Sequence, residues 1–126
     1  MTWTWLAVFI GGGLGSLCRY GLSKATIPFF VSFPIQTLLS NLLASTLLGV
    51  LTAFFLFKST DVIPAWKLFA ATGFCGGFST FSTFGLETFQ LLQAGRYWMA
   101  VLYVLLSVLI CLASLALGFY LMRLSS

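Results

Sequence analysis

Residues 73–84 read GFCGGFSTFSTF and lie within a long apolar stretch of the chain. A membrane-spanning helix is ordinarily rich in leucine, isoleucine and valine, whereas this segment concentrates glycine, hydroxyl and phenylalanine side chains. Gly73, Gly76 and Gly77 weaken a helix here because glycine loses more backbone freedom on folding than other residues. The segment therefore predicts an interrupted helix, with close helix packing through glycine as the alternative.

The composition places this segment in an integral membrane protein. Of the 126 residues, 60% are hydrophobic and 6% are charged, and the mean hydropathy is +1.09. Because about 20 apolar residues cross about 30 Å of hydrocarbon, a chain of this length holds about four spans joined by short loops. We therefore expect an all-α fold with one membrane domain over residues 1–126 and no separate soluble domain.

The apolar segments predict where the four transmembrane helices lie. The expected spans cover residues 5–20, 35–57, 65–92 and 99–122, and the third is expected to be broken near residues 73–80. The segment from Gly21 to Pro34 is expected to form a loop, and Gln93–Arg96 a short turn.

The basic residues are divided evenly between the two ends of these spans. Three fall on each side: Arg19, Lys24 and Arg96 on one, and Lys58, Lys67 and Arg123 on the other. Basic residues near span ends ordinarily set orientation, so an even division carries little orientation signal. Such a chain either takes its orientation from another feature or inserts in both directions, as an antiparallel homodimer requires. The balanced charge also argues against a polybasic lipid-binding patch.

The polar side chains within the predicted spans are mostly neutral. Arg19 and Glu87 lie near span ends rather than at a span centre, so the sequence indicates no proton relay at mid-membrane. The neutral set consists of amide and hydroxyl groups: Asn41, Ser79, Thr80, Ser82, Thr83, Ser107 and Ser114. These groups donate hydrogen bonds without a negative charge, which suits the passage of a small anion. The alternative is that each hydroxyl bonds to its own helix and serves packing.

Phenylalanine recurs every three positions in the quoted segment, as serine and threonine do. On a continuous helix this spacing places Phe78, Phe81 and Phe84 on one face, beside stripes that pair Ser79 with Ser82 and Thr80 with Thr83. The electropositive ring edges of Phe81 and Phe84 would attract a dehydrated anion weakly, whereas Phe78 is expected to pack in the core or against lipid. Carbonyls freed by a helix break would bind a small cation such as Na⁺ where two copies meet.

The cysteines indicate no disulfide framework and no zinc site. Cys18, Cys75 and Cys111 are odd in number and widely spaced, and the chain contains no histidine. We interpret them as small packing residues. The sequence pairs no nucleophile with a base and shows no cluster of metal ligands, so we do not expect an enzyme.

The quoted segment, taken with Glu87, the glycines of residues 11–15, Arg19 and Asn41, resembles the Fluc (CrcB) family of fluoride channels. The similarity extends over essentially the whole chain and is most specific in residues 76–84. It implies an antiparallel, dual-topology homodimer with two fluoride pathways, located in the bacterial cytoplasmic (inner) membrane. The expected partners are fluoride, a second copy of the chain and the lipid bilayer, with no nucleic acid.

The resemblance also implies roles for individual residues. A structural Na⁺ at the dimer interface would be held by the backbone carbonyls of Gly76 and Ser79. The fluoride pathway would contain Arg19, Thr37, Asn41, Phe81, Ser82, Thr83, Phe84, Glu87, Ser107 and Cys111. In this set, Phe81 and Phe84 would supply the aromatic lining, Asn41 the pore-facing amide and Arg19 the basic residue at the vestibule. Cys111 departs from the family pattern, because the family commonly has a pore-lining serine there and a thiol is a weaker donor.

The expected function is passive, fluoride-selective conduction that lowers the cytoplasmic concentration of fluoride. An alternative is a small proton-coupled exporter of cations or drugs, for which Glu87 is the candidate carboxylate. A third interpretation is an accessory subunit without transport of its own.

Overall fold

The first long helix extends well beyond its predicted span. The structure is a computed structural model that describes residues 2–26, 33–58 and 63–125. Helix α1 (Thr2–Thr26) includes the start of the segment predicted as a loop. The hydroxyls of Ser23 and Thr26 donate to the carbonyls of Tyr20 and Leu22, which are bonds within the last turns of this helix. The loop prediction is therefore wrong for residues 21–26, and residues 27–32 lie outside the described ranges.

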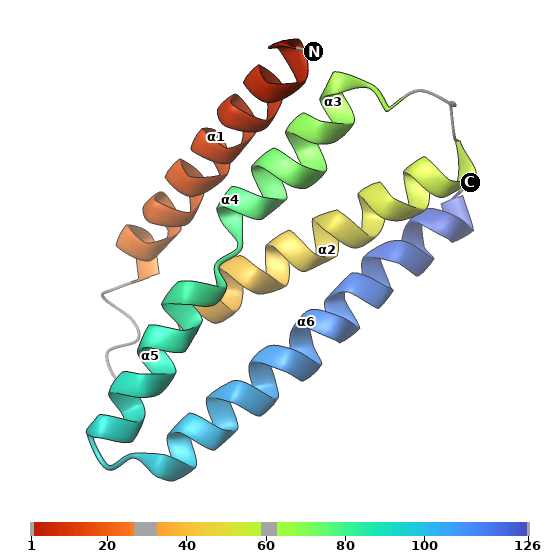
Figure 1. Ribbon diagram of the computed structural model, residues 1–126. Coiled ribbons are helices and arrows are strands. Elements are labelled where there is room, and N and C mark those ends of the chain that lie inside the picture. The colour runs from red at the N-terminus through yellow and green to blue at the C-terminus, as the bar shows by residue number, and fades with distance from the viewer. Residues whose placement is uncertain (1, 27–32, 59–62, 126) are drawn as a thin grey trace.

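Helices α2 (Ile35–Phe57) and α6 (Tyr97–Ser125) run side by side in the same direction (Figure 1). Glycine allows their backbones to approach closely. A Cβ atom at Gly49 would collide with the carbonyl oxygen of Leu115, and one at Gly118 with that of Thr46. Small residues at such crossings bring the helices within van der Waals contact, which drives association where lipid is as apolar as the side chains.

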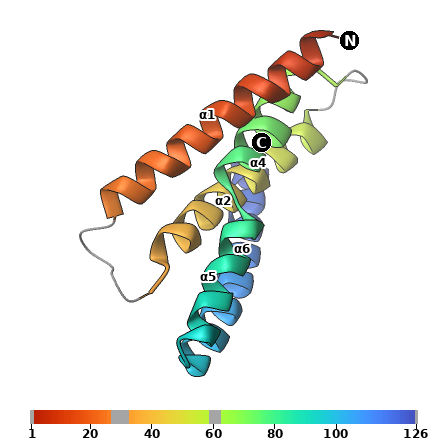
Figure 2. The ribbon, with the colours of Figure 1, turned by 60° about the vertical axis from the view of Figure 1, so that its left-hand side comes forward.

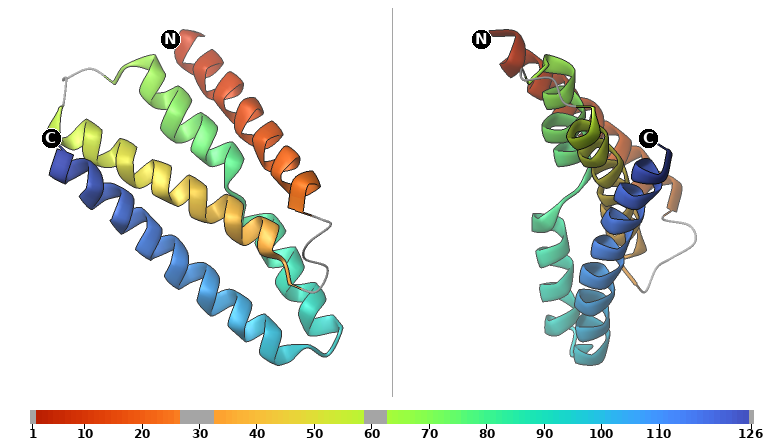
Figure 3. Two further views of the ribbon diagram at one scale, coloured as in Figure 1. Left: turned by 180° about the vertical axis from the view of Figure 1, so that it is seen from behind. Right: turned by 90° about the vertical axis from the view of Figure 1, so that its right-hand side faces the viewer.

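The third helical segment consists of several parts in a row. It begins with α3 (Ala65–Lys67), continues as the π-helix η1 (Leu68–Cys75) and the short α4 (Gly76–Phe78), and resumes after two extended residues as α5 (Phe81–Gln93). The parts before the break pack against α1, and α5 packs against α6. Figure 3 shows the extended link that joins α4 to α5. The break therefore lets one segment change its neighbours halfway along its length.

Glycines allow the backbone of α1 to lie close to the backbone of the first half of this segment. A Cβ atom at Gly15 would collide with the carbonyl oxygen of Phe74, and one at Gly77 with that of Gly12. An added Cβ at Gly73 would lie 2.9 Å from the Val8 carbonyl oxygen. Gly76 has nothing within 4 Å of the corresponding position. Close packing, the alternative interpretation of these glycines, therefore applies to Gly73 and Gly77 but not to Gly76.

A tight turn joins α5 to α6 (Figure 1), and α5 lies in front of α6 in the view of Figure 2. Gly95 has φ of 74°, a left-handed conformation that glycine adopts without steric cost. The N–H groups of Gly95 and Arg96 donate to the carbonyls of Leu92 and Leu91, which is the Schellman arrangement at a helix end. The turn brings Leu91 and Tyr103 into the same buried cluster.

The described residues contain three unbroken helices that are long and apolar enough to cross a membrane: α1, α2 and α6. The interrupted segment, residues 65–93, runs along the same bundle and would supply a fourth crossing (Figure 1). Both ends of the described chain then lie at one end of the bundle. The all-helical fold class is confirmed for the described residues, and the fourth crossing stays a prediction.

The glycine contacts predict a difference between two substitutions in α1. Gly15→Ala places a Cβ against the Phe74 carbonyl oxygen, whereas Gly13→Ala places one where no atom lies within 4 Å. Overpacking costs about 1–3 kcal/mol, so we expect Gly15→Ala to lower the free energy of unfolding in detergent by that amount. Denaturant titration measures it, with Gly13→Ala as the control, which should be at least as stable as the wild-type chain because alanine favours a helix over glycine. Equal stability of the two variants would contradict the proposed packing.

Candidate functional site

Ser79 and Thr80 interrupt the third helical segment in an extended conformation. Ser79 has ψ of 158°, and Thr80 has φ of −154° and ψ of 123°. Thr80 is the N-cap of α5, and its Oγ1 accepts the Thr83 N–H at 3.2 Å. Serine and threonine are favoured at N-caps because their oxygen satisfies a donor that the first helical turn leaves unpaired. The Ser-Thr pair therefore starts a new helix instead of continuing the previous one.

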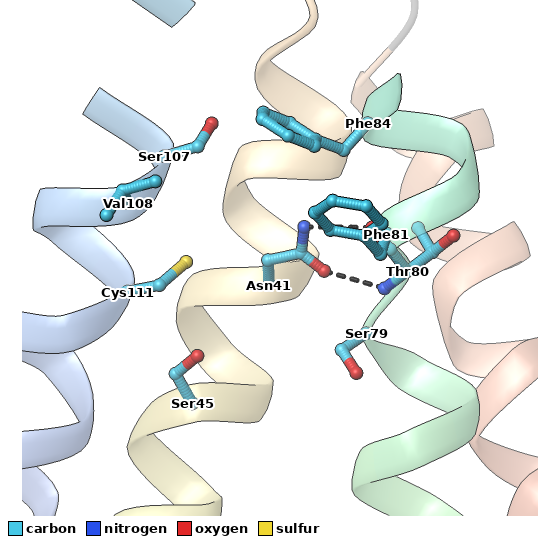
Figure 4. A pocket seen from close by; sticks show the side chains of 9 residues that line it. All are labelled: Asn41, Ser45, Ser79, Thr80, Phe81, Phe84, Ser107, Val108 and Cys111. Carbon is cyan, nitrogen blue, oxygen red and sulfur yellow. Dashed lines mark hydrogen bonds between the residues drawn. The ribbon is translucent and has the colours of Figure 1, made fainter. Parts of the chain in front are cut away.

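The side chain of Asn41, on α2, bonds to both backbone groups of Thr80 (Figure 4). Its Oδ1 accepts the Thr80 N–H at 2.7 Å, and its Nδ2 donates to the Thr80 carbonyl at 3.2 Å. A backbone group at membrane depth must find such a partner, because lipid offers none. The predicted pore-facing amide of Asn41 therefore supplies the hydrogen-bond partners that the Thr80 backbone needs at the break.

Two carbonyls lose their helical partners as a direct result. In a continuous α-helix the Thr80 N–H would bond to the Gly76 carbonyl, and the Thr83 N–H to the Ser79 carbonyl. These donors bond instead to Asn41 Oδ1 and to Thr80 Oγ1. Gly76 is also exposed, and nothing lies within 4 Å of the position that a Cβ atom would occupy there. The carbonyls of Gly76 and Ser79, which the resemblance assigns to Na⁺, are thus released from the helix.

The carbonyl of Gly77 is satisfied from α1. Arg19 Nε donates to it at 3.2 Å, and Ser16 Oγ lies at 3.4 Å. A guanidinium has five N–H donors, so this bond leaves other donors of Arg19 for a second partner. Arg19 therefore holds the end of α4 while keeping a positive charge beside the break.

Glu87, on α5, is bonded through both carboxylate oxygens. Thr37 Oγ1 donates to Oε1 at 2.7 Å, and the Tyr103 hydroxyl donates to Oε2 at 2.6 Å. Tyr103 is fully buried, and its ring lies 5.2 Å from that of Phe84 between centroids. Hydrogen bonds to charged groups are stronger than neutral ones, so this triad links α2, α5 and α6 firmly.

A first cavity, of about 280 Å³, lies between α2, α5 and α6 (Figure 4). Five predicted pathway residues line it: Asn41, Phe81, Phe84, Ser107 and Cys111. Ser45, Ser79, Thr80 and Val108 complete the lining. Its polar groups are an amide, hydroxyls and a thiol, so no formally charged side chain lines it.

A second cavity, of about 290 Å³, lies on the α1 side of the break. Four further pathway residues line it: Arg19, Thr37, Thr83 and Glu87. Thr80 lines both this cavity and the first one. Thr80 therefore borders both cavities, of which the second has charged side chains in its lining and the first has none.

Two predicted residues, Gly76 and Ser82, line neither of these two cavities. Gly76 lines a third cavity, of about 250 Å³, to which Ser79 and Ser45 also contribute. Ser82 is exposed on the first turn of α5 and lines none of these three cavities. Sequence reasoning missed Ser45 and the acceptor role of Glu87 toward Tyr103. A signal for Tyr103 was present, because Tyr103, Ser107 and Cys111 recur every four residues on one helix face.

The predicted stripes on a continuous helix are only partly correct. Phe81 and Phe84 are neighbours in α5, with ring centroids 5.5 Å apart, but Phe78 lies before the break, buried beside Phe74. Burial of Phe78 agrees with its predicted packing role. The stripe of Ser79 with Ser82 does not form, because Ser79 lies before the extended link and its hydroxyl donates to the Cys75 carbonyl at 2.8 Å.

The cysteines occupy three different environments. Cys75 is buried, Cys111 is half-buried beside the first cavity and Cys18 is exposed. The predicted packing role therefore fits Cys75, whereas the exposed Cys18 does not pack within the described chain.

These features define a class: a multi-pass helical membrane protein with a helix break whose Thr80 borders two cavities that contain polar side chains. Over residues 6–119 the chain matches the family described as CrcB-like protein, Camphor Resistance (CrcB). The chain belongs to this family, as its resemblance predicted.

Relatives of high identity cover nearly the whole chain. A protein of Pyrococcus abyssi named Fluoride-specific ion channel FluC is 48% identical over 120 residues, which are 95% of this chain and 96% of that protein. Proteins with the same name from Pyrococcus horikoshii and Salmonella arizonae are each 47% identical over 116 residues, 92% of this chain, and those residues cover 93% and 91% of the two relatives. These relatives are named as ion channels, in agreement with the expectation that this chain is not an enzyme.

The bond pair between Asn41 and Thr80 predicts a specific loss of stability. Asn41→Asp keeps an acceptor for the Thr80 N–H but removes the donor to the Thr80 carbonyl. Leaving a buried polar group unpaired costs about 1–3 kcal/mol, and we expect that decrease in the free energy of unfolding in detergent. Ser40→Ala is the control on α2, because the Ser40 hydroxyl bonds to the Gln36 carbonyl of its own helix. If the Asn41→Asp variant were as stable as the Ser40→Ala variant, the bridging role of Asn41 would be refuted.

Proposed function

We propose that this protein is a fluoride-selective channel that lets fluoride leave the cytoplasm passively. The observation that carries the proposal is the pair of cavities that share Thr80 in their lining, one of them beside Arg19 and the other with only neutral polar side chains. The relatives named Fluoride-specific ion channel FluC support fluoride as the ion.

The proposed route begins in the second cavity. The guanidinium of Arg19 raises the local concentration of anions there, because an opposite charge in a narrow, partly dehydrated site is poorly screened. The hydroxyls of Thr37 and Thr83 and the carboxylate of Glu87 border the same space. With both oxygens of Glu87 already accepting hydrogen bonds, the negative charge of this residue is partly compensated.

The route continues into the first cavity, where fluoride would exchange water for neutral donors. The Asn41 amide has two N–H donors, and the bond to Thr80 uses one of them. Ser107 adds a hydroxyl, and the edges of Phe81 and Phe84 add weak electropositive contacts. Contacts of this strength replace part of the hydration shell without trapping the ion, which conduction requires.

Glu87 bears on the alternative of proton-coupled export. Such an exporter requires a carboxylate that gains and loses a proton in contact with the transported ion. Both oxygens of Glu87 are engaged by Thr37 and by the buried Tyr103, so the residue is built into the contact between α2, α5 and α6. This engagement supports a positioning role for Glu87 and favours the passive channel.

The working form is proposed to be an antiparallel homodimer with a structural Na⁺ at its interface. The released carbonyls of Gly76 and Ser79 fit a small cation, because unsatisfied backbone oxygens are the ligands that Na⁺ takes at helix breaks. Gly76 and Ser82 are exposed, and Phe81 keeps 83% of its surface accessible. Because lipid cannot satisfy free carbonyls, this face requires cover, and a second inverted copy would provide it.

The even division of basic residues supports insertion in both directions. The proposed location is the cytoplasmic membrane of the cell. Relatives occur in both Pyrococcus and Salmonella, so the likeness does not restrict the proposal to bacteria.

Ion efflux from liposomes that contain the purified protein tests the function. We expect fluoride efflux to be much faster than chloride efflux. A proton gradient should not drive fluoride beyond its electrochemical equilibrium. Phe81→Ile and Phe84→Ile should each slow fluoride efflux, because they remove the ring edges from the first cavity. Phe89→Ile is the matched control, since Phe89 is exposed on α5 and does not line that cavity. Fluoride efflux no faster than chloride efflux, or uphill movement driven by protons, would reject the passive channel.

Replacement of Na⁺ tests the cation site separately. Exchange of Na⁺ for N-methylglucamine should lower the thermal unfolding temperature and shift the protein toward monomer in size-exclusion chromatography, because the released carbonyls then lose their ligand. Ser79→Ala should keep this dependence, since the carbonyl rather than the hydroxyl is the proposed ligand. The site is ruled out when unfolding and oligomeric state are the same in both cations.

A further inference from the structure

Ser107 and Cys111 present a hydroxyl and a thiol to the same cavity from one face of α6. They are four residues apart, so their Cβ atoms lie about 5–6 Å from each other on the helix surface. Figure 4 shows both side chains directed into the space between α6 and Asn41. Both residues line the first cavity.

Among the described residues, Ser107 Oγ is the one buried side-chain oxygen or nitrogen without a hydrogen-bond partner. The hydroxyls of Ser40, Thr46 and Thr88 each donate to the carbonyl four residues earlier. Ser107 is 7% exposed, and its Oγ has no hydrogen-bond partner among the described residues. A buried hydroxyl at membrane depth ordinarily has a partner, so this one indicates a ligand in the cavity.

The thiol of Cys111 determines which ligand this pair of side chains would hold most tightly. It is a free thiol and half-buried. The described residues contain no group of three or more His, Cys, Asp or Glu side chains that could hold a metal. The described residues therefore offer no tetrahedral zinc site, but a thiolate is the kind of ligand that selects soft cations, and the Ser107 oxygen would add only a weak contact.

We propose that Cys111 Sγ and Ser107 Oγ form a binding site for a soft, thiophilic metal cation of the Hg²⁺, Ag⁺ and Cu⁺ class. On binding, the S–H bond of Cys111 breaks, a bond forms between sulfur and the metal, and the proton passes to water. No electron is transferred. Ser107 Oγ contributes a lone pair to the same ion.

Occupation of this site would close the ion route. The metal would occupy the cavity that Asn41, Phe81 and Phe84 also line, and it would exclude an anion from that space. This consequence for flux rests on the proposed function, whereas metal binding itself does not.

Mercury uptake and fluoride efflux are measured on the same protein samples. The double variant Cys18→Ser/Cys75→Ser keeps Cys111 as its one thiol, and each variant without metal serves as its own reference. We expect this protein, folded in detergent, to bind one Hg²⁺ per chain by native mass spectrometry. In liposomes, Hg²⁺ should abolish its fluoride efflux, and excess dithiothreitol should restore it.

Two matched variants locate the site. Cys111→Ser in the otherwise native chain should keep its efflux in Hg²⁺, because a hydroxyl does not form the sulfur bond. Ser107→Ala, added to the variant with Cys111 alone, should release Hg²⁺ at a lower concentration of competing glutathione. Failure of Cys111 to bind Hg²⁺ in the folded protein, undiminished efflux at one Hg²⁺ per chain, or equal block of Cys111→Ser would each overturn the proposal.

The outcomes separate this site from the proposed function. Absence of fluoride efflux before Hg²⁺ is added would reject the channel, and the mass measurement would still decide whether the metal binds. Unchanged release from Ser107→Ala would remove Ser107 from the site.

Discussion

The rest of the structure depends on one requirement: the backbone N–H and carbonyl of Thr80 must both be hydrogen-bonded. An interrupted helix at membrane depth exposes N–H and carbonyl groups that lipid cannot satisfy. The amide of Asn41 bonds to both groups of Thr80, and the Thr80 hydroxyl bonds to the Thr83 N–H. These three bonds allow extended residues to lie between two helices, in a place where an unpaired backbone group would cost several kcal/mol.

The stable break has consequences on both of its sides. Before it, η1 and α4 pack against α1 through glycine, where a Cβ at Gly15 or Gly77 would collide with a carbonyl oxygen. After it, α5 is joined to α2 and α6 through Glu87, which accepts from Thr37 and Tyr103. The same break releases the carbonyls of Gly76 and Ser79 and places Thr80 in the lining of two cavities. The candidate cation site and the candidate anion route thus have one structural origin.

Part of this arrangement was predictable from local sequence features. Hydropathy indicates the long helices, and glycine followed by Ser-Thr pairs indicates an interruption in the third. The glycines themselves were harder to interpret, because the same residue both weakens a helix and permits close packing. In the structure Gly73 and Gly77 lie within helical segments against α1, and the extended residues are Ser79 and Thr80. The predicted stripe of three phenylalanines assumed a continuous helix, and the break places Phe78 apart from Phe81 and Phe84.

By itself, the sequence determined the membrane class, the helical fold and the set of polar side chains available within it, because these depend on composition and on spacing along one helix. Only the tertiary structure decided which of those side chains meet. The bonds from Asn41 to Thr80, from Thr37 to Glu87 and from Tyr103 to Glu87 join residues 39, 50 and 16 positions apart. A hydrogen bond requires a particular distance and angle between two groups, and spacing within one helix does not specify how that helix lies against another.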